Sequence, residues 1–265
     1  MANKFAIVTG ASTGIGYELA SIAAEEGYDL LVVANEPLID AAARDFETHG
    51  IVAHSVEADL STTDGVDRLL AAVSDRRVDV LCANAGSGFG GAFLDQTVDQ
   101  WRHTIDTNVT GTLYLLHKML PLMISQGEGR VLVTGSIAGY VPGAFNATYN
   151  ATKAFIDNFT DAVRNELKDA EGVTLTTLMP GATDTEFFSR AGMEDTRVGK
   201  ADKTDPHKPA RDGWDAMIDG KDRVVSGLLN KLQVAGSGIA PPSILAAMHR
   251  KLAEPLGDDE KLSEQ

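Results

Sequence analysis

Short apolar runs alternate with longer helical patterns through most of this 265-residue chain, and this alternation constrains its fold more than any other feature. The runs are rich in Val, Ile and Leu and are nearly continuous in apolar residues. Strands of this kind are typical of a parallel sheet that helices cover on both faces. The expected strands span residues 5–10, 29–34, 51–56, 78–83, 130–135, 173–179 and 222–227.

The sequence therefore predicts an α/β fold in which a doubly wound parallel sheet forms the middle of three layers. The helical patterns between the runs cover residues 14–26, 38–48, 63–74, 100–125 and 149–168. No repeat and no Pro/Gly-rich linker divides the chain before about residue 185, and α/β domains often reach this length undivided. We expect one domain over residues 1–265.

The chain changes character after this pattern. The polar stretch 191–222 carries DPHKPA and Trp214, and we expect a substrate-loop region of short helices and loops at about 186–222. A surface insertion without a role is the alternative. Residues 227–265 are predicted to form a C-terminal helical tail with an apolar stripe at 243–256. We expect this stripe to pack on the body of the protein or on a sister subunit rather than on a membrane, because the tail ends in acidic residues.

Composition excludes several classes of partner. The chain has 23 Lys and Arg against 38 Asp and Glu, a formal charge of -15, which disfavours binding to nucleic acids and to anionic membrane surfaces. The segment MANKFAIVTG lacks the regions of a signal peptide and no apolar run could span a bilayer, so we expect a cytoplasmic protein. Cys82 lies in an apolar run and should be buried, and the six histidines lack metal-ligand spacing, so no metal site is expected.

A glycine-rich turn joins the first expected strand to the first expected helix. The segment TGASTGIG spans residues 9–16 and places glycines at 10, 14 and 16. Glycines permit a tight turn and a close approach of the backbone, and the start of a helix offers free amides to a pyrophosphate. The segment predicts a dinucleotide site, although an ordinary glycine-rich loop is the alternative.

A second pattern predicts proton transfer. Tyr149 and Lys153 are four residues apart in YNATK, and Ser136 precedes the tyrosine by thirteen residues. Positions i and i+4 share one face of a helix, so the ammonium group can stabilise the ionised phenol. A tyrosine that acts near neutral pH needs its pKa lowered by about three units, or roughly 4 kcal/mol. The Lys153 charge is a plausible source.

The order and spacing of these motifs resemble those of the short-chain dehydrogenase/reductase family. The similarity covers most of the chain and includes the TGxxxGxG turn, the YxxxK pair, the ANAG segment at 83–86, Asn108 in the segment TNVTG and the PGATDT segment from Pro180. Ala83 departs from the family, whose members commonly carry a second Asn there. This departure affects a supporting contact.

The resemblance implies a Rossmann-like, NAD(P)-binding fold and a catalytic tetrad of Asn108, Ser136, Tyr149 and Lys153. Tyr149 would exchange a proton with the substrate oxygen while a hydride passes between substrate and nicotinamide. Ser136 would stabilise the substrate oxygen. Lys153 would lower the pKa of Tyr149 and bind the nicotinamide ribose, and Asn108 would hold a water in a proton relay. Each residue also has a structural alternative: Ser136 capping a loop, Asn108 bonding to the helix backbone and Lys153 lying in solvent.

The resemblance also implies the cofactor contacts. Asp59 would lie beside the adenine, although it could also cap a helix, and Thr185 would contact the nicotinamide carboxamide. The residues expected to bind the cofactor are Gly10, Ser12, Thr13, Gly14, Ile15, Gly16, Ala34, Asn35, Asp59, Leu60, Asn84, Ala85, Gly86, Tyr149, Lys153, Pro180, Gly181, Thr183 and Thr185.

The choice between NAD and NADP stays open at this stage. An acidic side chain at the end of the second strand binds the ribose 2'-hydroxyl, and a basic one binds a 2'-phosphate. Ala34 and Asn35 stand where the family has its Asp or Arg, and Glu36 follows them. Thr13 replaces the basic residue that many NADP enzymes place in the glycine turn.

The expected function is NAD(P)-dependent interconversion of a secondary alcohol and a ketone or aldehyde, as in a carbonyl reductase. A regulatory protein that binds NAD(P) without catalysis and a non-redox member of the fold are the alternatives. We expect a homodimer or homotetramer, because family members commonly pair through the two long helices. The apolar series on the second helix is Phe155, Phe159, Val163 and Leu167, and the candidate substrate contacts are Phe89, Phe93, Phe187, Met193 and Trp214.

Overall fold

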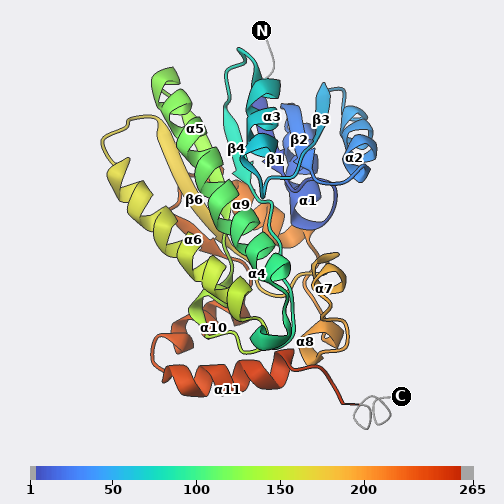
Figure 1. The fold of residues 1–265 in the computed structure, drawn as a ribbon. Coiled ribbons are helices and arrows are strands. Elements are labelled where there is room, and N and C mark those ends of the chain that lie inside the picture. The colour runs from blue at the N-terminus through green and yellow to red at the C-terminus, as the bar shows by residue number, and fades with distance from the viewer. Residues whose placement is uncertain (1–3, 258–265) are drawn as a thin grey trace.

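A seven-stranded parallel sheet forms the middle of the molecule (Figure 1). The structure is a computed structural model that describes residues 4–257. The strand order is β3-β2-β1-β4-β5-β6-β7, so the direction of winding reverses between β1 and β4. The strands are β1 (Phe5–Thr9), β2 (Asp29–Ala34), β3 (Ala53–Glu57), β4 (Val80–Ala83), β5 (Gly129–Thr134), β6 (Val173–Met179) and β7 (Arg223–Val225). The predicted doubly wound fold is confirmed, and each strand overlaps its predicted run.

Helices cover both faces of this sheet. One apolar cluster joins the sheet to α1 (Gly14–Glu25), α2 (Leu38–Glu47) and α9 (His207–Ile218). A second cluster joins the opposite face to α3 (Thr63–Val73), α5 (Thr112–Gln126) and α6 (Ala147–Glu166). The three-layer arrangement follows from these two clusters.

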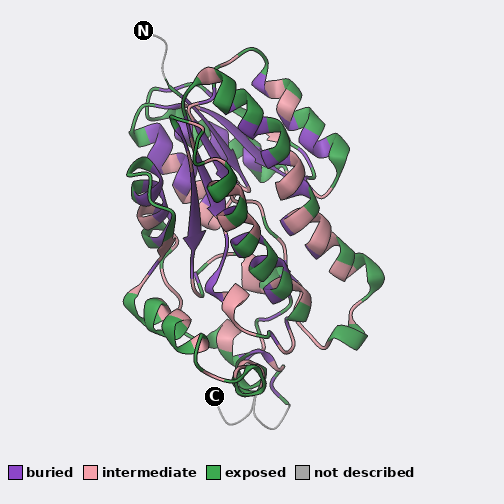
Figure 2. Cartoon of the chain, turned by 90° about the vertical axis from the view of Figure 1, so that its left-hand side faces the viewer, coloured by how far each residue is buried: buried purple, intermediate pink, exposed green. Residues whose placement is uncertain are grey.

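The central strands supply both clusters because successive side chains point to opposite faces. In β1, Ala6 and Val8 belong to the first cluster, whereas Phe5 and Ile7 belong to the second. The five central strands are buried almost throughout, the edge strands β3 and β7 are partly exposed, and most other exposed residues lie on the outer surfaces of the helices (Figure 2). Cys82 lies fully buried in β4, as expected, and burial raises the pKa of its thiol.

The predicted helix at 100–125 is interrupted. It consists of α4 (Val98–Ile105), a π-helical turn at Asp106–Gly111 and α5. Thr97 and Gln100 form a capping box at the start of α4. A Cβ at Gly111 would lie 1.9 Å from the carbonyl oxygen of Leu60, so glycine is required where the π turn meets the loop after β3. Turns of this type occur frequently at functional sites.

The polar stretch after β6 contains more regular structure than the sequence predicts. The short helices α7 (Phe187–Arg190) and α8 (Arg197–Lys200) fit the expected loop region, but α9 is a three-turn helix of the main core. Trp214 on α9 is 1 % exposed and its ring packs edge-on to Tyr28, with centroids 5.5 Å apart. Trp214 is therefore a core residue, and its prediction as a substrate contact is wrong.

Two helices follow β7, as predicted for the C-terminal tail. They are α10 (Leu228–Ser237) and α11 (Pro242–Ala253), which lie beyond the carboxyl ends of the strands (Figure 1). Ala253 and Leu256 are buried, and the Leu256 amide donates to the carbonyl of Asp195 at 2.9 Å. The end of α11 thus packs on the body of the protein, while residues 258–265 of the predicted tail lie outside the described part. None of the described helices is long and apolar enough to cross a membrane.

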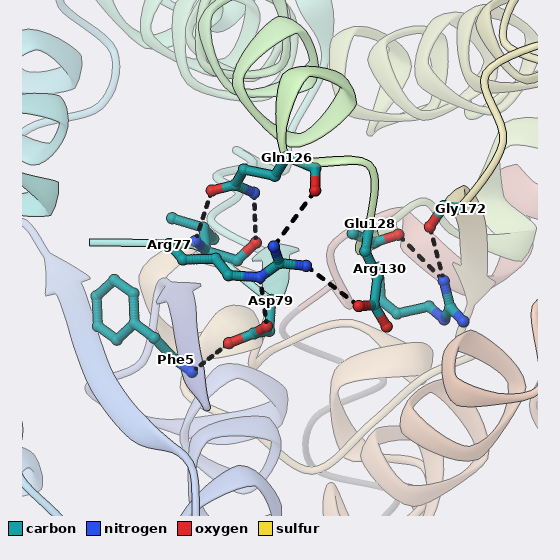
Figure 3. Close-up of polar contacts among 9 residues, drawn as sticks. Phe5, Arg77, Asp79, Gln126, Glu128, Arg130 and Gly172 are labelled. Atoms are coloured by element: carbon teal, nitrogen blue, oxygen red, sulfur yellow. Dashed lines mark hydrogen bonds and ion pairs between the residues drawn. The ribbon is translucent and has the colours of Figure 1, made fainter. Parts of the chain in front are cut away.

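A polar network joins the amino ends of the central strands, opposite the glycine turn (Figure 3). The amide of Phe5 donates to Asp79 at 2.8 Å, and Arg77 contacts Asp79 and Glu128 at 3.4 and 3.1 Å. Arg130 donates to the carbonyl of Gly172 at 3.0 Å. These contacts satisfy backbone groups where the strands begin and fix the relative register of β1, β4, β5 and β6.

The core position of Trp214 can be tested by truncation. Replacing this buried indole with alanine should destabilise the protein by about 3–5 kcal/mol, because the change removes apolar contacts and leaves a cavity. Urea denaturation followed by circular dichroism measures the loss. Phe93→Ala is the matched control, since Phe93 is 55 % exposed and its removal should cost less than about 0.5 kcal/mol. Equal unfolding midpoints for the two variants would contradict this assignment.

Candidate active site

A cavity of about 600 Å³ opens at the carboxyl ends of the strands, where the strand order reverses between β1 and β4. Ligands of open α/β sheets bind at such a reversal because the loops on its two sides diverge. The loops after β1, β2, β3, β4, β5 and β6 all contribute to the cavity wall. The fold thereby gathers motifs that are far apart in sequence.

The glycine turn forms one end of this cavity. Gly10 and Gly14 adopt positive φ angles of 65° and 60°, which favour glycine. A Cβ at Gly16 would lie 2.0 Å from the carbonyl oxygen of Gly10, so that position also excludes a side chain. The start of α1 lines the cavity, and the side chain of Thr13 does not cap its first amides, which are therefore free. The turn thus has the close backbone approach and the helix start that suit a pyrophosphate.

The segment after β4 is braced against the turn. The Thr9 hydroxyl accepts hydrogen bonds from the amides of Asn84 and Ala85, each at 3.0 Å. The Asn84 side chain donates to the Thr9 carbonyl at 3.1 Å and accepts from Thr134 at 3.0 Å. Asn84 therefore links β1, β4 and β5, and it holds the wall of the cavity with its own side chain.

Asn108 lies behind the cavity wall rather than on it. Its side-chain amide donates to the Ser87 carbonyl at 2.8 Å and to Thr152 at 2.9 Å, and its oxygen accepts from the Ser87 amide at 2.7 Å. It is 2 % exposed. These contacts join the π turn to the loop after β4 and to α6, next to Lys153. The proton relay assigned to Asn108 by the family resemblance stays a prediction.

Ser136 and Tyr149 meet inside the cavity. Ser136 follows β5 and caps the 3-10 helix at Ile137–Tyr140, accepting from the Ala138 amide at 3.1 Å. Its side chain also lies beside the Tyr149 phenol and lowers the pKa of that phenol. The capping role and the contact with Tyr149 therefore coexist. Phe187 covers the Tyr149 ring, with ring centroids 4.8 Å apart.

The pKa of the Tyr149 phenol lies above its ordinary value in this structure, not below it as expected. Burial, helped by the nearby Asp157 carboxyl group, raises the pKa of the phenol to about 12 against the lowering effect of Ser136. The ammonium of Lys153 donates to the Thr134 carbonyl at 2.8 Å and lies 5.7 Å from the centre of the Tyr149 ring. Burial lowers the pKa of Lys153 to about 8. The residues form the expected pair on α6, but burial outweighs the expected lowering of the phenol's pKa, and the ammonium group is held at the end of β5.

Asp157 is a buried carboxyl group one turn beyond Lys153 on α6. It is 7 % exposed, and its oxygens form no hydrogen bond of regular geometry with the described residues. Burial raises its pKa to about 7, against the lowering effects of Lys153, the Ser136 amide and Arg223. Glycine at 135 and 139 leaves room for the carboxyl group. Nothing in the sequence distinguishes this residue from an exposed partner of Lys153.

The structure brings nearly all predicted site residues together. Every residue expected to bind the cofactor lines the cavity, as do Ser136, Phe89, Phe187 and Met193. Phe93 does not line it: this side chain is 55 % exposed in a 3-10 turn at Phe93–Asp95, so its prediction as a substrate contact is wrong. The lining residues that the sequence did not reveal include Ser87, His103, Asn146, Asn150, Phe188, Arg190, Asn230, Gln233, His249 and Leu252.

Comparisons with known proteins agree with this geometry. The family described as short chain dehydrogenase matches residues 4–195. The chain belongs to the short-chain dehydrogenase family. An uncharacterized oxidoreductase of Staphylococcus epidermidis is 35 % identical over 207 residues, which cover 75 % of this chain and 88 % of the relative. The predicted family and the prediction of an oxidoreductase are thereby confirmed.

Solved structures of the family share the fold. A short-chain dehydrogenase from Sphingobium yanoikuyae in complex with NADPH has a TM-score of 0.79 and 26 % identity, with 89 % of this chain and 94 % of that chain covered. A family member from Burkholderia phymatum in complex with NAD has a TM-score of 0.82 at 21 % identity, with 96 % and 98 % covered. The second likeness supports the fold alone.

Burial of Asp157 predicts a pH-dependent gain in stability when its charge is removed. The folded-state pKa of about 7 exceeds the ordinary 3.8, so its favourable contribution is present at low pH and is lost as pH rises through about 7. Asp157→Asn should therefore raise the free energy of unfolding more at about pH 8 than at about pH 5. Urea denaturation at both pH values measures the difference.

The matched control is Asp169→Asn, which changes an exposed aspartate in the turn after α6. Its effect on stability should be small and alike at both pH values, because solvent screens an exposed charge. A gain for Asp157→Asn that shrinks between the lower and the higher pH would contradict the buried position of the carboxyl group.

Proposed function

We propose that the protein is an NAD(P)-dependent oxidoreductase that interconverts a secondary alcohol and a ketone or aldehyde, with Tyr149 as the general acid and base. The observation that carries the proposal is the meeting of the Tyr149 phenol and the Ser136 hydroxyl in the same cavity as the glycine turn. One cavity would then contain the proton donor, a hydroxyl that can hydrogen-bond to the substrate oxygen, and the site for the dinucleotide. Family membership supports the same chemistry.

The cavity residues fit a dinucleotide. The glycine turn has the backbone approach and the helix start for the pyrophosphate, and Asp59 and Leu60 line the wall where the adenine is expected. Asp59 also accepts from the Ser61 amide at 2.9 Å, so it stabilises the turn before α3 as well. Pro180, Gly181, Thr183 and Thr185 would hold the nicotinamide end. When bound, the nicotinamide donates or accepts the hydride.

In the reducing direction, the chain's own residues supply the proton. The Tyr149 phenol, whose pKa burial raises to about 12, is protonated at neutral pH and can donate to a carbonyl oxygen. The Ser136 hydroxyl would donate a second hydrogen bond to that oxygen and stabilise the developing negative charge. Lys153, held at the Thr134 carbonyl, would keep a positive charge beside the phenolate that remains.

The substrate side of the cavity is mixed in character. Phe89, Phe187 and Met193 contribute apolar surface to the cavity, as does Leu252 of α11, and Phe187 packs on the Tyr149 ring. Polar groups reach the same cavity from His103, Asn146, Asn230, Gln233 and His249. We infer a partly apolar alcohol or carbonyl compound, since a few polar groups in an apolar wall are typical of small-molecule sites.

Replacing Tyr149 with phenylalanine tests the assigned chemistry. The variant should bind NADH or NADPH as the wild type does, because the ring and its packing on Phe187 are retained. Turnover of the substrate should fall by at least about 10²-fold, the usual contribution of a general acid. A panel of alcohols and carbonyl compounds, assayed separately with NAD(H) and NADP(H), identifies the substrate and measures the loss.

Tyr140→Phe is the matched control. The Tyr140 hydroxyl accepts from Arg223 at 2.9 Å and does not line the cavity, so its loss should leave turnover within about threefold of the wild type. Near-normal turnover by Tyr149→Phe on the same substrate would refute the general acid role. Failure of the wild type to bind either dinucleotide would refute the proposed function itself.

We also propose a homodimer or homotetramer. Phe155 is 45 % exposed on α6 and stacks on Phe159, with ring centroids 6.0 Å apart. Phe159, Val163 and Leu167 pack in part on the protein's own core, so Phe155 is the member of the predicted apolar series that is most available to a second subunit. Light scattering should give two or four chain masses, and Phe155→Glu should lower that mass. A wild-type mass of one chain would contradict this proposal.

A further inference from the structure

An ion pair joins the substrate segment to the end of β2. Nη2 of Arg190, the last residue of α7, lies 3.0 and 3.1 Å from the two carboxylate oxygens of Glu36. Glu36 also accepts a hydrogen bond from the Ser12 hydroxyl at 2.5 Å. The arginine and the glutamate are 154 residues apart in sequence. The contact therefore brings together the glycine turn, the loop after β2 and the substrate segment.

The backbone of the substrate segment places Arg190 at this position. Thr185 packs on the glycine turn so closely that a Cβ at Gly14 would lie 2.8 Å from its methyl group. α7 begins two residues later and carries Arg190 past the turn toward Glu36, with Glu186 also 3.8 Å from the guanidinium. The segment thus crosses over the glycine turn.

Arg190 supplies the positive charge at this end of the cavity. Among the Lys and Arg side chains of residues 4–257, Lys153 and Arg190 line the cavity, and Lys153 is held at the Thr134 carbonyl. Arg190 shares the wall with Ala34 and Asn35, at the end of β2 in the expected adenosine site. Neither of these residues nor Thr13 carries a charge, so none of them can neutralise a phosphate.

Glu36 and Arg190 favour different groups on an adenosine ribose. A carboxylate beyond the second strand accepts from a 2'-hydroxyl, whereas a guanidinium binds a 2'-phosphate with paired hydrogen bonds. The side chain of Arg190 is 45 % exposed and that of Glu36 is 23 % exposed. An ion pair with this much exposure contributes little stability, so a phosphate can compete with Glu36 for the guanidinium.

We propose that Arg190, delivered by the substrate segment, is the ligand for a 2'-phosphate and that Glu36 restrains it in the absence of that phosphate. The inference rests on the proposed function, since it requires a dinucleotide in the cavity. The residue that selects between the two cofactors then comes from α7 rather than from the loop after β2. The same pair also lets the enzyme bind NAD(H), because Glu36 can accept from a 2'-hydroxyl while it keeps Arg190.

Two adenosine fragments isolate the 2'-phosphate from the rest of the cofactor. Titration calorimetry with 5'-AMP and with 2'-phospho-AMP compares ligands that differ in this group alone. Arg190→Gln should weaken the binding of 2'-phospho-AMP about tenfold or more, which is the effect of losing a charge-assisted hydrogen bond. The same variant should change the affinity for 5'-AMP less than about twofold. NADPH and NADH, titrated by fluorescence, should follow the same order.

Glu36→Gln tests the restraint. Removing this carboxylate frees Arg190 and removes its repulsion of a phosphate, so 2'-phospho-AMP and NADPH should bind several-fold more tightly. The double variant Glu36→Gln, Arg190→Gln should lose most of this gain. If Glu36→Gln improves NADPH binding equally with and without Arg190, Glu36 acts by repulsion alone and the role of Arg190 is refuted.

Arg211→Gln provides the matched control. Arg211 forms an ion pair of the same length with Glu26, at 3.0 Å, on the outer face of α9 and away from the cavity. This variant should bind 5'-AMP, 2'-phospho-AMP, NADH and NADPH with the same affinities as the wild type. If Arg190→Gln loses equal affinity for 5'-AMP and for 2'-phospho-AMP, then Arg190 only closes the segment over the cofactor, and the proposal is overturned. If the wild type binds none of the four ligands, the proposed function fails first.

Discussion

The cavity exists because the parallel sheet aligns the carboxyl ends of its strands and reverses its winding between β1 and β4. Loops from the two halves must separate at that reversal, and the space between them becomes the cavity. The glycines at 10 and 16 then let two loop backbones approach where any Cβ would collide. Thr9 and Asn84 satisfy the polar groups that this approach buries. Close packing, the conformational freedom of glycine and hydrogen bonding therefore together shape the cavity at the carboxyl ends of the strands.

The face of α6 toward β5 concentrates ionisable groups in a desolvated place. Tyr149, Lys153 and Asp157 follow one another at four-residue intervals, and burial shifts the pKa of each toward its neutral form. Neutral forms dominate there because a charge loses its hydration on burial, and the partners present restore only part of the loss. The lysine and the aspartate compensate each other in part. Such a cluster reduces stability, and perturbed groups of this kind are typical of active sites.

The fold was largely predictable because strands buried on both faces are nearly continuous in apolar residues, and the runs at β1, β2 and β5 have few polar residues. The cofactor wall was predictable because a strand-turn-helix geometry demands glycine. The sequence did not predict α9, since its few apolar positions lie among charged ones and Trp214 alone resembles a loop aromatic. The contact between Glu36 and Arg190 was not predictable either, because no local pattern specifies which surface charges meet across the fold.

The C-terminal helices add a wall that the family match does not include, since that match ends at residue 195. His249 on α11 connects this wall to the loop before Tyr149. Its Nδ1 lies 2.8 Å from the Ala144 carbonyl, which can only accept, so Nδ1 carries the proton. Nε2 then accepts a hydrogen bond at 3.4 Å from the side chain of Asn150, which is the residue after Tyr149. Burial lowers the pKa of His249, which keeps the ring neutral and this pairing intact. Residues outside the shared family region thus contact α6 directly, one residue away from Tyr149, and form part of the same cavity wall.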